Sequence, residues 1–296
     1  MTRARTPLAE ALRHRTVVLD GGLGDQLAAQ GCDLSGGLWS ARVLAEDPAQ
    51  VQAAHTAYAR AGAEVLITAS YQVGYEAFAR HGYDRARTTA LLRDSVTLAD
   101  RAARAVAHEV WVAASVGPYG ATLADRSEYR GRYGLSVREL AAFHRPRIET
   151  LLEAGADVLA LETVPDTDEA EALLSLLAGT GARAWLSYTV AGDRTRAGQP
   201  LAEAFAAAAA APEVIAVGVN CCAAADVLPA LEAAAAVTAK PLLAYPNDSS
   251  GTADWPLAAW RRAGARLIGG CCGTGPPQTA ALAAAASRGA RPPGTP

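Results

Sequence analysis

Eight short runs of apolar residues recur along the chain, separated by longer segments rich in alanine, leucine, arginine and glutamate. Several runs are apolar at successive positions, as in Val-Ile-Ala-Val-Gly-Val at 214–219, which is typical of parallel strands buried on both faces. The expected strands are Val17–Gly22, Glu64–Ser70, Val110–Gly117, Val158–Val164, Ala184–Val190, Val214–Cys221, Pro241–Asn247 and Ala265–Cys272.

The segments between these strands have helical character. The clearest expected helices are Asp47–Ala61, Ala86–Ala107, Ser136–Ala154, Asp168–Leu177, Leu201–Ala211 and Asp226–Ala236. Three helix-to-strand turns carry Ala-Gly-Ala, at 61–63, 154–156 and 263–265, and glycine suits the position just after a helix. Eight strands alternating with helices predict an α/β protein with a (β/α)8 TIM barrel fold. We expect one barrel domain over residues 1–287 and a flexible Gly/Pro-rich tail over residues 288–296.

A doubly wound open sheet is the alternative architecture, because Asp20-Gly-Gly-Leu-Gly follows the first strand. The dinucleotide-binding fingerprint requires G-x-G-x-x-G and an acidic residue at the end of the second strand. Leu27 stands where the last glycine would be, and the second strand has no acidic end. The pattern therefore favours the barrel.

Composition narrows the classes of partner. The 296 residues suit a barrel, 51% are hydrophobic and 19% charged, and the formal net charge is −3. This charge gives no basis for binding nucleic acid or an anionic membrane. No apolar run reaches the roughly 18 residues of a membrane span, and Met1–Arg15 does not resemble a secretory signal, so a cytoplasmic location is expected.

Four of the five cysteines stand at predicted strand ends, at Cys221, Cys222, Cys271 and Cys272. The active site of a TIM barrel lies at the carboxyl ends of its strands, so the sixth and eighth strands should bring these thiols together. Sulfur-rich tetrahedral coordination favours zinc. Cys271 and its neighbour can share one metal only if the strand has already ended, since successive strand residues point to opposite faces, and the flanking glycines permit such a turn.

Other readings of the cysteines stay open at this point. They can be small buried apolar residues, Cys271 and Cys272 can form a vicinal disulfide, and four cysteines can close a structural zinc site. A structural site usually shows C-x-x-C spacing, which does not occur here. Cys32 lies in a predicted loop and receives no role.

At these residues the chain resembles the homocysteine S-methyltransferase family. The Gly218-Val-Asn-Cys and Gly269-Gly-Cys-Cys pair carries the strongest signal. Further matching segments are Leu19-Asp-Gly-Gly, Leu38-Trp-Ser-Ala, Ile67-Thr-Ala-Ser-Tyr-Gln, Ser115-Val-Gly-Pro-Tyr-Gly, Ser127-Glu-Tyr-Arg-Gly, Phe143-His-Arg-Pro-Arg, Leu161-Glu-Thr and Tyr245-Pro-Asn. Two of them, around Tyr129 and His144, are similar to the short, cobalamin-independent members that use S-methylmethionine or S-adenosylmethionine.

The resemblance implies a set of roles. Cys221, Cys271 and Cys272 would be the zinc ligands, with Cys222 a bystander packed under the site. The amino group of homocysteine would meet Asp20 and Glu162, and its carboxylate would meet backbone N–H groups near Gly21 and Gly117 and the hydroxyl of Ser70. Trp39 and Tyr71 would line the donor side, where an aromatic face attracts a sulfonium cation.

The implied function is a zinc-dependent methyltransferase of methionine biosynthesis, which moves a methyl group from a sulfonium donor to the thiol of L-homocysteine. Zinc would keep that thiol ionised, so no protein acid or base is expected. Betaine as donor, selenocysteine as acceptor, and a zinc-binding scaffold without activity are the alternatives. A Schiff-base barrel is disfavoured because Lys240, the only lysine, stands at the start of its strand, and a phosphate cradle at Gly269-Gly270 would leave the cysteines unexplained.

Two departures from the family pattern stand beside this site. Many relatives carry Thr-Glu where this chain has Asp25-Gln26, and the loop that follows Asn247 is short.

Overall fold

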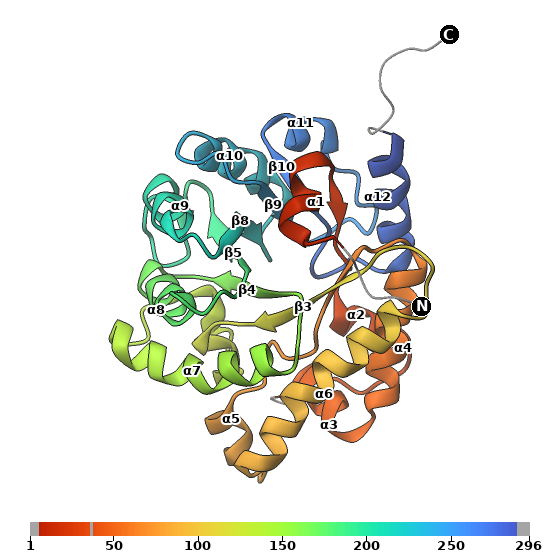
Figure 1. Ribbon diagram of the computed structural model, residues 1–296, viewed down its shortest axis with the longest axis vertical. Helices are drawn as coiled ribbons and strands as arrows, with labels where there is room; N and C mark the ends of the chain where they lie inside the picture. The colour runs from red at the N-terminus through yellow and green to blue at the C-terminus, as the bar shows by residue number, and fades with distance from the viewer. Residues whose placement is uncertain (1–5, 36–37, 289–296) are drawn as a thin grey trace.

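The computed structural model describes residues 6–35 and 38–288, with only the backbone described at Trp39 and Arg288. Eight parallel strands form one sheet in the order β1-β10-β9-β8-β5-β4-β3-β2, and a parallel bridge between Leu19 and Val65 joins its two ends. The strands are β1 Val17–Val18, β2 Val65–Ile67, β3 Trp111–Val116, β4 Val158–Val164, β5 Ala184–Tyr188, β8 Val214–Asn220, β9 Leu242–Tyr245 and β10 Ala265–Ile268. Helices surround this sheet (Figure 1). The predicted (β/α)8 TIM barrel is therefore confirmed.

All six predicted helices are present with small shifts at their ends. They are α4 Pro48–Arg60, α6 Arg85–Ala103, α7 Val137–Glu153, α8 Thr167–Leu177, α9 Leu201–Ala210 and α10 Ala224–Ala235. Local sequence explains where α7 begins, because Ser136 and Glu139 form a reciprocal capping box at its first turn.

Further elements were not predicted from the sequence. They are α1 Leu8–His14, α2 Leu23–Ala29, α3 Trp39–Glu46, α5 Tyr75–Arg80, α11 Leu257–Arg262, α12 Pro276–Arg288, the 3-10 turns η1 Tyr119–Leu123 and η2 Ser127–Tyr129, and a hairpin of β6 Val190–Ala191 and β7 Arg194–Thr195. Helix α12 includes Arg288, the first residue of the predicted tail, and residues 289–296 lie outside the described part of the chain.

Most strands end earlier than predicted at the mouth of the barrel, where side chains replace backbone acceptors. The carboxylate of Asp20 accepts the N–H of Ile67 at 2.8 Å, and the hydroxyl of Thr68 accepts the N–H of Ser115 at 3.0 Å. The amide oxygen of Asn220 likewise accepts the N–H of Thr163 at 2.7 Å. Because buried N–H groups must be paired, these polar side chains allow the strands to diverge and open a cavity.

Two apolar layers stabilise the barrel. Inside it, Trp111, Trp185 and Leu243 pack in a cluster to which all the remaining strands of the barrel also contribute residues. Leu8 and Leu12 of α1 belong to the same cluster. Outside it, a larger cluster lies between the strands and the surrounding helices. Within the described residues, no helix is long and apolar enough to cross a membrane.

Because the strands pack closely at Gly218, an added methyl group there should lower the stability of the protein. A Cβ there would lie 2.0 Å from the carbonyl oxygen of Leu243 on the adjacent strand. We expect Gly218→Ala to lower the free energy of unfolding by about 1–3 kcal/mol, measured by urea denaturation. Gly24→Ala in α2 is the matched control, since its Cβ would lie 3.8 Å from Leu34 and should leave stability unchanged or slightly higher. Equal stability of the two variants would contradict this packing argument.

Candidate metal centre and substrate cavity

Three cysteine sulfurs lie together at the mouth of the barrel. Cys221 directly follows β8, whereas Cys271 and Cys272 follow β10 after two glycines. The Sγ of Cys272 is 4.0 Å from the Sγ of each of the other two, and all three sulfurs are within 4.8 Å of one another. Strands β8 and β10 are separated by β9 in the sheet, so the cluster spans three adjacent strand ends.

Backbone geometry after the strands makes this cluster possible. Cys221 adopts φ 51°, in the left-handed region, and its neighbour Cys222 is fully buried among the residues between barrel and helices. Gly273, at φ 81°, completes the turn after Cys272, and a Cβ there would lie 2.2 Å from the carbonyl oxygen of Asp248. The cysteine pair therefore lies beyond the pleat of β10, as sharing one metal requires.

The cluster fits a thiolate-bound metal. With zinc–sulfur bonds of about 2.3 Å and tetrahedral angles, ligand sulfurs lie about 3.8 Å apart, close to the 4.0 Å separations found here. Hydrogen bonds from Cys221 and Cys271 lower the pKa of the Cys272 thiol, so one proton leaves readily. The thiols are free, and together they supply three ligands.

Tyr129 contacts the cluster and was not singled out as a site residue from the sequence. Its hydroxyl lies 2.9 Å from the Sγ of Cys221, and the guanidinium of Arg196 stacks over its ring at 5.7 Å. Burial raises the pKa of this phenol, so it stays protonated and can donate a hydrogen bond to a thiolate. In the sequence, Tyr129 belongs to the Ser127-Glu-Tyr-Arg-Gly segment, which indicated a resemblance to a family but not that this tyrosine lies beside the cysteines.

A cavity of about 370 Å³ opens beside the three sulfurs. Glu162 lines it, and its carboxylate accepts a hydrogen bond from the hydroxyl of Ser115. The carboxylate of Asp20 is not among the lining residues; it is 2% exposed and accepts hydrogen bonds from the N–H of Ile67 and the hydroxyl of Tyr245, which does line the cavity. Burial raises the pKa of Asp20 well above its usual value and that of Glu162 to about 7, so both carboxylates would gain from a bound cation.

Only some of the other residues expected to contact homocysteine line the cavity. Gly21 lines the cavity, but Ser70 and Gly117 are not among its lining residues. The hydroxyl of Ser70 donates to the carbonyl of Ser115 at 2.7 Å, so it is already engaged. Thr68 lines the cavity instead and contacts Ser70 at 2.7 Å.

On the expected donor side, the structure describes one of the two aromatic side chains. Tyr71 lines the cavity, and its ring packs so closely on Gly117 that a Cβ there would lie 2.6 Å from ring atoms. The side chain of Trp39 lies outside the described atoms, although its backbone begins α3.

Asp25, one of the departures from the family pattern, contacts the turn that carries Cys272. Its carboxylate accepts the N–H of Gly273 at 2.8 Å and also lines the cavity. Burial raises its pKa. The residue therefore helps to hold the turn that carries Cys272.

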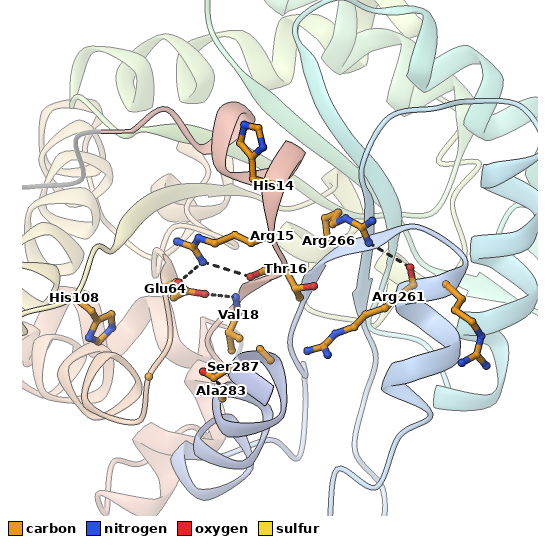
Figure 2. Close-up of a pocket in the computed structure, with 13 residues that line it drawn as sticks. His14, Arg15, Thr16, Val18, Glu64, His108, Arg261, Arg266, Ala283 and Ser287 are labelled. Carbon is orange, nitrogen blue, oxygen red and sulfur yellow. Dashed lines mark hydrogen bonds and ion pairs between the residues drawn. The ribbon is translucent and has the colours of Figure 1, made fainter. Parts of the chain in front are cut away.

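A larger cavity of about 880 Å³ lies at the opposite, amino-terminal end of the barrel (Figure 2). Two of its arginines, Arg15 and Arg266, are engaged with the protein itself. Arg15 pairs with Glu64, and the guanidinium of Arg266 donates to the carbonyl oxygens of Arg261 and Ala265. These contacts hold the starts of the strands in place, and no cysteine is among the described residues that line this cavity.

Lys240 lies at the same amino-terminal end, at the start of β9. Its ammonium donates to the carbonyl oxygens of Ala211 at 2.6 Å and Val214 at 2.7 Å. A Schiff-base role at the mouth of the barrel is incompatible with this placement.

Known proteins match this chain over most of its length. Residues 17–286 match the sequence model of the homocysteine S-methyltransferase family. The chain is 45% identical to the homocysteine S-methyltransferase of Escherichia coli K12, covering 94% of this chain and 98% of that protein. It is 39% identical to homocysteine S-methyltransferase YbgG of Bacillus subtilis 168, covering 90% and 93%. The metallated crystal structure of the homocysteine methyltransferase MmuM from Escherichia coli has a TM-score of 0.89 at 47% identity, covering 95% of this chain and all of that one.

Because its pKa is raised, Glu162 should destabilise the substrate-free protein when its carboxylate is ionised. The folded protein holds this proton more tightly than the unfolded chain, so stability falls as pH rises from about 4.5 to about 7. We expect Glu162→Gln to raise the free energy of unfolding of the reduced, chelator-treated protein by up to about 3 kcal/mol at pH 8, and by almost nothing at pH 4. Denaturant unfolding at both pH values measures this, and a gain independent of pH would contradict the electrostatic cause.

Proposed function

This chain belongs to the homocysteine S-methyltransferase family, and we propose that it transfers a methyl group from a sulfonium donor to the thiol of L-homocysteine, with zinc as its metal. Homocysteine methyl transfer is the activity named for relatives that match nearly the full length of the chain. The observation that carries the finer proposal is the cluster of Cys221, Cys271 and Cys272 at the edge of a cavity lined by a buried carboxylate.

Three cysteine sulfurs match the protein ligand set of a catalytic zinc site, which would leave one coordination position for the substrate. Bound zinc would keep a coordinating homocysteine thiol ionised at neutral pH, where a free thiol with a pKa near 8.5 is mostly protonated. The hydroxyl of Tyr129 would donate a hydrogen bond to the Cys221 sulfur and so disperse part of the negative charge on that ligand. No residue is then needed as a general base.

Asp20 and Glu162 are proposed to bind the ammonium group of homocysteine. Each carboxylate is buried with a raised pKa, and each keeps its orientation through hydrogen bonds from Tyr245 and Ser115 respectively. A cation between them restores the charge balance that burial disfavours. Fixing this end of the substrate directs its sulfur toward the cysteine cluster, and such orientation is a large part of the rate enhancement in bimolecular reactions.

The cavity favours a compact methyl donor. Ligand cavities span roughly 300–1,000 Å³, and the 370 Å³ found here must serve two substrates. S-methylmethionine and homocysteine are both small amino acids, whereas S-adenosylmethionine adds a nucleoside. The ring of Tyr71 supplies an aromatic face that can attract a sulfonium cation. We therefore propose S-methylmethionine as the preferred donor.

Removing one ligand tests the metal proposal. Cys271→Ser should bind zinc at least tenfold more weakly in chelator competition and lose methionine formation, because the metal loses one of three thiolates. Cys222→Ser is the matched control, since that sulfur is buried outside the cluster, and it should retain zinc and activity. Turnover by a zinc-free Cys271→Ser protein would overturn the zinc proposal.

Parallel rates with three methyl donors test the donor proposal. With homocysteine as acceptor, we expect kcat/KM to be highest for S-methylmethionine, lower for S-adenosylmethionine because of its size, and near background for betaine. Selenocysteine offered in place of homocysteine measures the breadth of acceptor choice. A higher kcat/KM with betaine than with S-methylmethionine would contradict a sulfonium-directed cavity.

A further inference from the structure

Glu128 is a buried carboxylate at the cavity whose charge is not used by the roles described above. It lies in the η2 turn, is 2% exposed and lines the cavity that contains the cysteine sulfurs. Its Oε2 is buried and has no hydrogen-bond partner among the residues that the structure describes. A buried acceptor without a partner is destabilising, more so when it is charged, so its retention needs a reason.

The surroundings of Glu128 do not neutralise it. Burial raises its pKa, and the negative charges of Asp125 and a Cys272 thiolate act in the same direction. Arg126 opposes them, but it is an exposed side chain that forms no ion pair with Glu128 in the described structure. A cationic ligand that donates hydrogen bonds would supply the missing partner and stabilise the ionised carboxylate.

The reaction brings two substrates, and the first already has carboxylates for its ammonium group. Asp20 and Glu162 are assigned to homocysteine, which leaves Glu128 for the second substrate. A sulfonium centre is cationic but has no N–H or O–H to donate, whereas the α-ammonium of an amino-acid donor has three hydrogens. Glu128 reaches the cavity from η2 and Glu162 from β4, so the two ammonium groups would be held by different elements.

We infer that Glu128 binds the α-ammonium group of the methyl donor and selects donors that are amino acids. This inference rests on the proposed methyl transfer and deepens it. S-methylmethionine and S-adenosylmethionine both carry the group, so the inference holds whichever is preferred. Betaine has a quaternary nitrogen without hydrogens and cannot satisfy the orphan oxygen of Glu128.

The first test is Glu128→Gln, which keeps the shape and removes the charge. Since a hydrogen bond to a charged group is lost, kcat/KM for S-methylmethionine should fall by about 10- to 100-fold. Zinc affinity in chelator competition and the Kd of homocysteine measured without donor should stay within about twofold. Asp125→Asn is the matched control, because this exposed acid is three residues away, and asparagine can still accept the N–H of Ser127; it should leave kcat/KM unchanged.

The second test uses a donor without the ammonium group. Dimethylsulfoniopropionate has a sulfonium and a carboxylate only, so wild type and Glu128→Gln should use it at equal, low rates. An unchanged kcat/KM for S-methylmethionine in Glu128→Gln, or an equal fall with both donors, would overturn the inference. A wild-type protein without any methyl transfer would instead defeat the proposed function, so the two failures are distinguishable.

Discussion

The convergence of three sulfurs at the barrel mouth is the constraint on which the rest of the site depends. Within a strand, Cys271 and Cys272 would point to opposite faces, and Cys221 belongs to a strand that does not pair with theirs. The chain meets this constraint by ending β10 at Ile268 and by placing Cys221 in a left-handed conformation. The cysteine cluster is thus a property of the turns, and the barrel supplies the rigid positions from which those turns begin.

Polar residues at the mouth of the barrel lower the stability of the protein and favour a bound cation. Asp20, Thr68 and Asn220 accept backbone N–H groups that a longer ladder would have paired, and the space so opened becomes the cavity. Carboxylates at this mouth are buried with raised pKa values, which disfavours the empty fold and favours a cationic ligand. Under the proposed function, Asp20 would both replace a backbone acceptor at a strand end and bind the substrate ammonium group.

The fold was predictable because the barrel repeats one βα unit and buries each strand on both faces, so that apolar runs mark all eight strands. The placement of the cysteines could also be anticipated, since strand ends meet at one face. Ser70, Tyr129 and Glu128 show what could not be predicted from the sequence. Whether a hydroxyl is free or engaged, and which turn residue reaches the mouth, depends on loop conformations such as η2 that no periodic pattern specifies. The short elements α2, α3 and α5 were missed for the same reason.

The most direct test of the account is the coordination of zinc in the reduced protein, measured by X-ray absorption with and without homocysteine. We predict three protein sulfurs near 2.3 Å without substrate, and four sulfurs once homocysteine is added. Four protein sulfurs before addition, or an unchanged sulfur count after it, would contradict the claim that Cys221, Cys271 and Cys272 hold a metal with a position reserved for the substrate thiol.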